Sequence, residues 1–227
     1  MGNPDGHSGV PTGGLRATIW NRDSVRRLWE GRGGQGPAGD SAPEIVRLSR
    51  KYVGGKVLDV GAGSGVLISR FPGAIGLDLA PRGPGVLRGD ACRMPFASGA
   101  FDTVFATELL EHLPESALAV GLKEICRVLK PGGRLVVATP YRENLSRHET
   151  VCPECGARFH SLGHVWSFDE ATLSAHLSDA GFDVLEVRVL PLGFRGRHRF
   201  LGRFSTLIAR ADFPVYLNLF VVARKHS

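Results

Sequence analysis

Short apolar runs and helix-type segments alternate along most of the chain. The runs predict strands at 56–60, 74–78, 86–89, 101–106, 133–139, 182–189 and 215–223. Apolar residues at helical spacing predict helices near 65–70, 108–112, 115–130 and 168–180. Because strands that alternate with helices join through right-handed crossovers, we expect one α/β domain. Its sheet should be mostly parallel, seven-stranded and flanked by helices.

Turn and capping residues mark several boundaries of these elements. Ser41 is a candidate N-cap for a helix that precedes the first strand, and Ser167 is one for the helix at 168–180. Gly181 is placed to end that second helix. The segment 130–133, Lys-Pro-Gly-Gly, predicts the end of a helix followed by a turn.

The first 40 residues differ in composition from the rest. Residues 1–14 are rich in glycine and proline and are predicted to be disordered. Residues 15–30 carry apolar side chains at helical spacing, which predicts a helix that lies over the active site. A flexible linker is expected at 31–39. The main domain is therefore expected at 41–227, with a basic excursion at 191–213 near its end.

Composition narrows the class of protein. The 227 residues are 43% hydrophobic and 22% charged, as in soluble globular proteins. No apolar run approaches the roughly 20 residues of a membrane span, and no signal peptide is visible. We therefore expect a cytoplasmic protein that does not bind a membrane. The net charge of +6 indicates either a solvated basic surface or one that steers an anionic partner such as nucleic acid.

A glycine-rich turn follows the first predicted strand. Residues 57–65 read Val-Leu-Asp-Val-Gly-Ala-Gly-Ser-Gly. A dinucleotide-binding turn would need a third glycine at Val66 instead. Asp59 is a poor neighbour for a pyrophosphate and a good one for a cation. S-adenosyl-L-methionine (SAM) carries an ammonium, a sulfonium and no phosphate. It therefore fits both the glycine spacing and the carboxylate of Asp59.

The turn resembles motif I of class I SAM-dependent methyltransferases, in particular the type 11-like enzymes that act on small molecules. Four further segments appear in the order of that family, around Asp78, Asp90, Thr107 and 129–135. The resemblance implies a Rossmann-like fold, a ribose-binding role for Asp78 and an adenine-binding role for Asp90. The cofactor-binding residues it implies are Asp59, Gly61, Ala62, Gly63, Asp78, Leu79, Asp90, Ala91, Thr107 and Glu108.

A second motif, Glu108-Leu-Leu-Glu111-His112, follows the fourth predicted strand. On a helix, these two carboxylates and the imidazole would share a face and could bind a divalent cation. The spacing is similar to that of ubiquinone-pathway O-methyltransferases and small-RNA 2′-O-methyltransferases, where such residues hold a metal. The resemblance implies a further ligand at His164. Alternatively the motif is an ordinary helix start, and His112 or His164 acts as a general base. Glu111, His112 and Tyr141 are the predicted catalytic residues.

A third motif lies within 148–166, directly after the fifth predicted strand. Cys152, Cys155, His160 and His164 have the ligand types of a tetrahedral structural Zn²⁺ site. The alternatives are a reduced dithiol without metal and a redox-active pair. His164 cannot serve this site and the Glu108-Glu111-His112 site together, and His148 is a spare ligand candidate for either.

These observations predict an enzyme that transfers a methyl group from SAM to a small-molecule acceptor. An oxygen acceptor in a biosynthetic pathway, for a secondary metabolite or a quinone-like compound, is favoured. The alternatives are an RNA 2′-O-methyltransferase that uses a divalent metal and a SAM-binding protein that transfers no methyl group. The sequence leaves the acceptor and the oligomeric state open.

Overall fold

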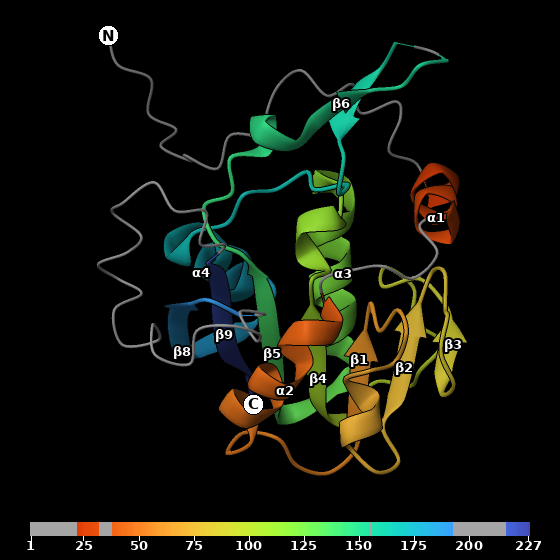
Figure 1. Ribbon diagram of the computed structural model, residues 1–227. Helices are drawn as coiled ribbons and strands as arrows, with labels where there is room; N and C mark the ends of the chain where they lie inside the picture. The colour runs from red at the N-terminus through yellow and green to blue at the C-terminus, as the bar shows by residue number, and fades with distance from the viewer. Residues whose placement is uncertain (1–21, 32–37, 155, 193–216) are drawn as a thin grey trace, which may run out of the picture.

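Seven strands form one twisted sheet in the order β3-β2-β1-β4-β5-β9-β8. The computed structural model describes residues 22–31, 38–154, 156–192 and 217–227. The strands are β1 (Val57–Val60), β2 (Ile75–Asp78), β3 (Val86–Arg88), β4 (Phe101–Thr107), β5 (Leu129–Pro140), β8 (Phe182–Leu190) and β9 (Asn218–Lys225). The first five strands pair in parallel, whereas β9 is antiparallel to both β5 and β8. The expected mostly parallel seven-stranded sheet is therefore confirmed (Figure 1).

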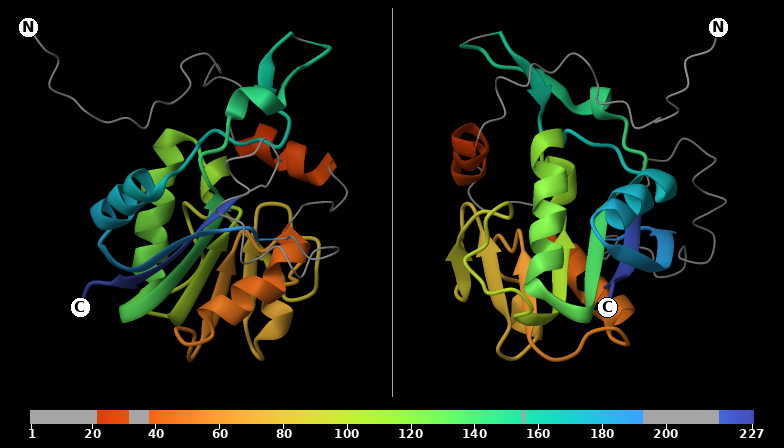
Figure 2. Two further views of the ribbon diagram at one scale, coloured as in Figure 1. Left: turned by 60° about the vertical axis from the view of Figure 1, so that its left-hand side comes forward. Right: turned by 180° about the vertical axis from the view of Figure 1, so that it is seen from behind.

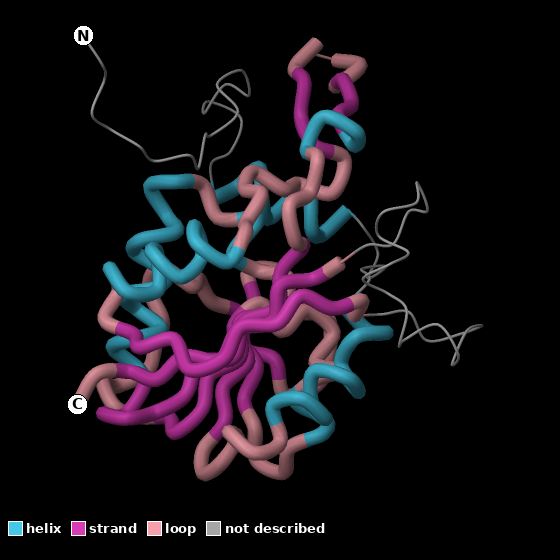
Figure 3. The backbone as a smooth tube through the Cα atoms, turned by 90° about the vertical axis from the view of Figure 1, so that its left-hand side faces the viewer, coloured by secondary structure: helices cyan, strands magenta, loops and turns pink. Residues whose placement is uncertain are grey.

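Helices cover both faces of this sheet (Figure 3). The helices are α1 (Arg22–Gly31), α2 (Ala38–Ser49), α3 (Glu115–Val128) and α4 (Glu170–Asp179). On one face, Ile45 of α2 belongs to a buried cluster with Phe105 and Phe220. On the other, Leu122 of α3 and Leu173 of α4 share a cluster with the opposite sides of the strands. Strand side chains alternate between the two faces, which explains why the central strands are apolar along their whole length.

Several local predictions differ from the structure. The segment 65–70 contains one turn of 3₁₀ helix, Ile68–Arg70, because Pro72 follows too closely for a longer helix. Ser41 lies inside α2 and does not cap it. The cap of α4 is Asp169, whose carboxylate accepts from Thr172 N, and not Ser167. Gly181 follows the end of α4 with a φ of +94°, as expected for a helix stop.

The stretch after β5 is more regular than its polar sequence indicates. A 3₁₀ turn, Leu145–His148, leads into a hairpin of β6 (Glu149–Val151) and β7 (Arg158–His160). Figures 1 and 2 show this hairpin and α1 on the same side of the molecule, beyond the carboxyl ends of the parallel strands. No helix within the described residues is long and apolar enough to cross a membrane.

Some predicted segments fall outside the described residues. They include the disordered start at 1–14, part of the helix at 15–30, most of the linker, Cys155 and most of the basic excursion at 191–213.

Candidate functional site

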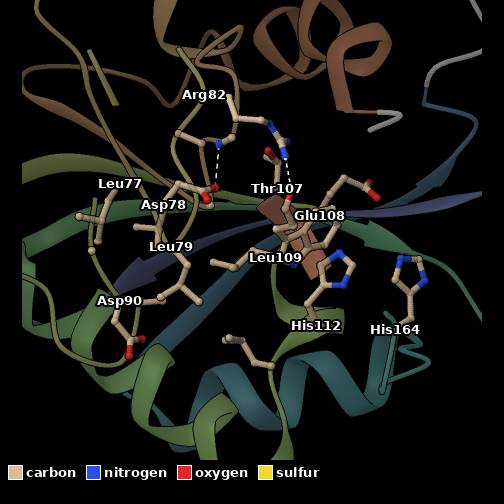
Figure 4. Close-up of a pocket in the computed structure, with 18 of the residues that line it drawn as sticks. Leu77, Asp78, Leu79, Arg82, Asp90, Thr107, Glu108, Leu109, His112 and His164 are labelled. Carbon is tan, nitrogen blue, oxygen red and sulfur yellow. Dashed lines mark hydrogen bonds between the residues drawn. The ribbon is translucent and has the colours of Figure 1, made fainter. Parts of the chain in front are cut away.

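A pocket lies at the carboxyl ends of β1, β2 and β4, where ligands bind in open α/β sheets. Trp29 of α1 forms part of its wall. The lining includes most of the predicted cofactor residues: Gly61, Ala62, Gly63, Asp78, Leu79, Asp90, Ala91, Thr107 and Glu108. His112 and His164 lie next to each other at one side of the pocket (Figure 4). The fold thus brings the glycine turn, His112 of the second motif and His164 of the third motif to one pocket, although the three motifs are separate in the sequence.

The glycine turn is held to β2 by Asp78. Gly61 and Gly63 have φ of +81° and +50°, a backbone conformation that favours glycine. Gly63 N donates to Asp78 Oδ2 at 2.8 Å, and Ala80 N donates to Asp78 Oδ1 at 2.7 Å. Since a carboxylate has about four acceptor positions, Asp78 can hold the turn and still accept from a ribose hydroxyl. Its ribose-binding role remains a prediction.

Two further aspartates, Asp90 and Asp59, were predicted to bind the cofactor. Asp90 lines the pocket, and its Oδ1 accepts from Cys92 N at 2.7 Å. Asp59 is buried in β1 and is not one of the lining residues that the structure describes. Its Oδ1 accepts no hydrogen bond from any described residue. Burial, together with the charge of Asp78, raises the pKa of Asp59 to about 8.

Glu108 follows β4 in a left-handed conformation with a φ of +50°. The prediction that Glu108 begins a helix is therefore wrong: only Leu110–His112 forms a 3₁₀ turn, and Pro114 follows it closely. Glu108 N donates to Ala138 O at 2.8 Å, and Asn218 Nδ2 donates to Glu108 Oε1 at 3.0 Å. Burial raises the pKa of Glu108 to about 7.

Glu111, His112 and His164 nevertheless form a compact group. One potential ligand atom of each lies within 4.8 Å of those of the other two. All three side chains are buried. Backbone pairing explains the contact, because Val165 N donates to Glu111 O at 2.7 Å and places the segment around His164 beside the 3₁₀ turn. The sequence predicted a candidate cation site at Glu108, Glu111 and His112 with His164 as a further ligand, and the group in the structure does not include Glu108.

Glu111 is fully buried and is not one of the described residues that line the pocket. Thr139 Oγ1 donates to Glu111 Oε2 at 3.0 Å, whereas Oε1 has no hydrogen-bond partner in the described part of the chain. That oxygen is 3.9 Å from His112 Nε2. Burial, with the nearby charge of Glu108, raises the pKa of Glu111 well above its usual value. A buried, incompletely bonded carboxylate of this kind calls for a cation or a proton.

Glu143 forms a second group with two histidines, His160 and His164. Its carboxylate oxygens contact His164 Nδ1 and lie 3.5 Å from His160 Nε2. Burial alone would raise the pKa of Glu143, but the two imidazoles beside its carboxylate lower it to about 2. No spacing or motif in the sequence marked Glu143. Its position depends on the path of the chain after β5.

The predicted zinc site with two cysteines and two histidines is not supported. Cys152 lies at the tip of the β6–β7 hairpin, where its N donates to Ala157 O. His160 lies at the other end of the hairpin, opposite Glu149. Three residues of extended strand therefore separate the position of Cys152 from that of His160 along the hairpin, a distance of about 10 Å. The two histidines group with Glu143 instead, while Cys155 lies outside the described residues.

The catalytic role predicted for Tyr141 is also not supported. Its hydroxyl donates to Glu170 Oε1 at 3.2 Å, so the side chain is directed toward α4. Tyr141 is not one of the described residues that line the pocket. Burial, together with the Glu170 carboxylate, raises the pKa of Tyr141, and a phenol with a raised pKa is a weaker candidate for a base.

Comparison with known proteins supports the fold described above. A family model described as a methyltransferase domain matches residues 38–187. The demethylmenaquinone methyltransferase of Mycolicibacterium vanbaalenii is 31% identical over 173 residues, which cover 63% of this chain and 75% of the relative. The chloroplastic tocopherol O-methyltransferase of Arabidopsis thaliana is 36% identical over 115 residues, covering 41% of this chain but only 32% of the relative.

Solved structures show the same fold at low sequence identity. The Burkholderia thailandensis 1,6-didemethyltoxoflavin-N1-methyltransferase, solved with bound 1,6-didemethyltoxoflavin and S-adenosylhomocysteine, has a TM-score of 0.62 and 18% identity. The match covers 93% of this chain and 89% of that one. At this identity, the similarity applies to the fold alone.

Proposed function

The chain belongs to the methyltransferase-domain family and is a SAM-dependent methyltransferase, and on this premise we propose that it methylates a hydroxyl oxygen of a small, largely apolar acceptor with the help of a divalent cation. A quinol or phenol is the acceptor class that we favour. The names of two relatives support this class, because one acts on demethylmenaquinone and the other is a tocopherol O-methyltransferase.

The group of Glu111, His112 and His164 carries the cation part of this proposal. Gly163 O is an acceptor only, so its 3.1 Å contact with His112 Nδ1 requires a hydrogen on Nδ1 and leaves the lone pair on Nε2. The same argument applies to His164, whose Nδ1 contacts the Glu143 carboxylate. Neutral imidazoles with a lone pair on Nε2 are the form that binds metals.

These residues fit a divalent cation by two tests. Two imidazoles and a carboxylate are a donor set typical of zinc, manganese or iron sites. In addition, the incompletely bonded Glu111 Oε1 faces the same group, 3.9 Å from His112 Nε2. Glu111, His112 and His164 would hold the cation, which would supply stabilisation of the negative charge on the acceptor oxygen.

Beyond binding the cation, the protein must align the acceptor with SAM and exclude water from the pocket. SAM supplies a methyl group that its sulfonium already activates, so the rate depends mainly on the position of the acceptor oxygen. The apolar side chains of Trp29, Leu113 and Leu162 line the pocket along with the two histidines. They provide a surface on which an aromatic acceptor can lie.

The experiment uses the full chain, SAM with a deuterated methyl group and a panel of quinols and phenols. Each reaction is run with Mn²⁺, Zn²⁺ or a chelator, and S-adenosylhomocysteine and methylated product are measured by mass spectrometry. We expect an O-linked deuterated methyl group and loss of turnover with the chelator. SAM binding without release of S-adenosylhomocysteine for any acceptor would contradict methyl transfer, and turnover that the chelator leaves unchanged would contradict the cation.

A matched pair of variants tests the ligand assignment. Glu111→Gln keeps the shape of the side chain and removes its charge, whereas Glu115→Gln makes the same change at an exposed position at the start of α3. We expect Glu111→Gln to lower cation affinity by at least the roughly 100-fold that loss of an outer partner can cost. Glu115→Gln should leave it unchanged. Equal cation content in both variants would remove Glu111 from the site.

A further inference from the structure

His164 is held from two sides by residues of the segment that follows β5. Its Nδ1 contacts Glu143 Oε2, and its backbone N donates to His160 Nδ1 at 3.2 Å. His160 Nε2 in turn faces Glu143 Oε1 at 3.5 Å. Glu143, His160 and His164 therefore form a closed loop of contacts, which we call the His164 bracket.

Both imidazoles of this bracket are buried, which restricts their orientation. His160 is 1% exposed, and its Nε2 forms no hydrogen bond with any described residue although it faces the carboxylate. The imidazoles of His160 and His164 are stacked, with ring centroids 4.7 Å apart and an angle of 18° between their planes. Rotation of the His164 ring would break both the stack and the contact with Glu143. The bracket thus determines which nitrogen of His164 faces His112, whose ring centroid is 4.8 Å away.

We propose that Glu143 is a positioning residue that sets the tautomer and orientation of His164, with His160 holding Glu143 in place, so that the site takes up a single cation. This inference rests on the proposed cation site of Glu111, His112 and His164. Glu143 does not touch the proposed cation and acts through the imidazole, in the manner of the carboxylate–histidine pairs that support metal ligands.

A second cation between Glu143, His160 and His164 is disfavoured by hydrogen bonding. His160 Nδ1 accepts the N–H of His164, so the hydrogen of a neutral His160 ring lies on Nε2. A nitrogen that carries a hydrogen has no lone pair for a metal. His164 Nδ1 also carries its hydrogen toward Glu143. We therefore expect one cation at Glu111, His112 and His164 and no second cation in the bracket.

The experiment compares Glu143→Gln with Glu149→Gln, an exposed carboxylate on β6 that pairs with Arg158. Zn²⁺ affinity is measured by competition with a chromogenic chelator, and SAM affinity by calorimetry. We expect Glu143→Gln to lower Zn²⁺ affinity by about 10- to 100-fold while SAM affinity stays within about twofold. Glu149→Gln should change neither. Unchanged Zn²⁺ affinity in Glu143→Gln would overturn the inference.

A second readout is independent of metal and of turnover. Long-range ¹H–¹⁵N NMR of the metal-free protein distinguishes the two neutral histidine tautomers. We expect a hydrogen on Nδ1 of His164 in the wild type and a mixture of tautomers in Glu143→Ala. The same wild-type tautomer in the variant would overturn the inference, even if the variant is less stable.

The two readouts separate this inference from the proposed function. If the wild type binds no divalent cation but the His164 tautomer depends on Glu143, the cation proposal fails and the positioning role stands. If the wild type binds a cation and Glu143→Gln binds it equally well, the positioning role fails and the proposed function stands. A stoichiometry of two cations in the wild type would overturn the single-site assignment.

Discussion

The indole of Trp29 meets the imidazole of His112 edge-on, with ring centroids 4.8 Å apart and an angle of 86° between the ring planes. This contact places α1 over the histidine side of the pocket. Arg82 Nη1 donates to Trp29 O at 3.2 Å, and Arg88 pairs with Glu30 at 3.2 Å. Among the described residues, this ring contact and these polar contacts hold α1 over the pocket.

Replacement of Trp29 should affect the acceptor more than the methyl donor. An aromatic pair contributes about 0.5–1.5 kcal/mol beyond its buried area, or roughly 2- to 12-fold in a binding constant. We expect Trp29→Ala to raise the KM of the acceptor by at least this factor, and Trp29→Phe to retain most of the affinity. Steady-state kinetics on the two variants checks this. An unchanged KM in Trp29→Ala would show that α1 does not contact the acceptor.

Asp78 should be required for SAM binding. Its carboxylate accepts from Gly63 N and Ala80 N and faces the pocket, so its loss removes both the predicted ribose partner and the hold on the glycine turn. Hydrogen bonds to charged groups contribute about 1.5–3 kcal/mol each, and we expect Asp78→Ala to weaken SAM binding by at least 10-fold in calorimetry. Asp183→Ala, at an exposed ion pair between β8 and β9, is the control. Equal SAM affinity in both variants would refute the ribose assignment.

Asp59 should make the stability of the ligand-free protein depend on pH. Its folded-state pKa of about 8 lies above the roughly 3.9 of an unfolded aspartate. Between these values the folded state binds more protons, so the free energy of unfolding falls as pH rises from about 4 to about 8. Asp59→Asn should flatten this decline, as urea denaturation across that range would show. An identical pH profile in wild type and variant would mean that Asp59 is already ionised at low pH.

Tyr141→Phe should leave turnover nearly unchanged, in contrast to His164→Ala. The Tyr141 hydroxyl bonds to Glu170 on α4 and does not line the pocket, so its loss should cost about 1 kcal/mol of stability and no catalysis. Initial rates and thermal unfolding of the two variants provide the measurement. A loss of more than about tenfold in kcat for Tyr141→Phe would restore the catalytic role that the sequence predicted.

Cys152→Ser should retain the cation at His164. Cys152 lies at the hairpin tip, about three residues along the strand from the level of His160. Elemental analysis of wild type and Cys152→Ser, both purified without chelators, checks this prediction. If the variant lost all bound metal, the cysteine and histidine residues would form one site, as the sequence motif indicated.

The fold could be predicted from the sequence because its signals are local. Alternating apolar runs, the glycine turn and the Lys-Pro-Gly-Gly stop each depend on neighbouring residues, and they led to the confirmed sheet. Local sequence patterns predicted the short helical segments less well than the strands. The E-x-x-E-H spacing grouped Glu108 and Glu111 for the wrong reason, since Glu108 is not helical. The two carboxylates are close because β4 ends at Thr107 and the 3₁₀ turn Leu110–His112 follows directly.

By itself, the sequence determined the sheet, most of the residues that line the pocket and the methyltransferase class, because the glycine turn and the strand-end aspartates are short-range patterns. Only the tertiary structure decided which residues surround His164. Contacts among the 3₁₀ turn Leu110–His112, β5 and the segment after β5 bring Glu143 and His160 to that imidazole and carry Tyr141 and Cys152 away from it. Such contacts depend on strand pairing and chain path across long sequence separations, and no local pattern in the chain encodes them.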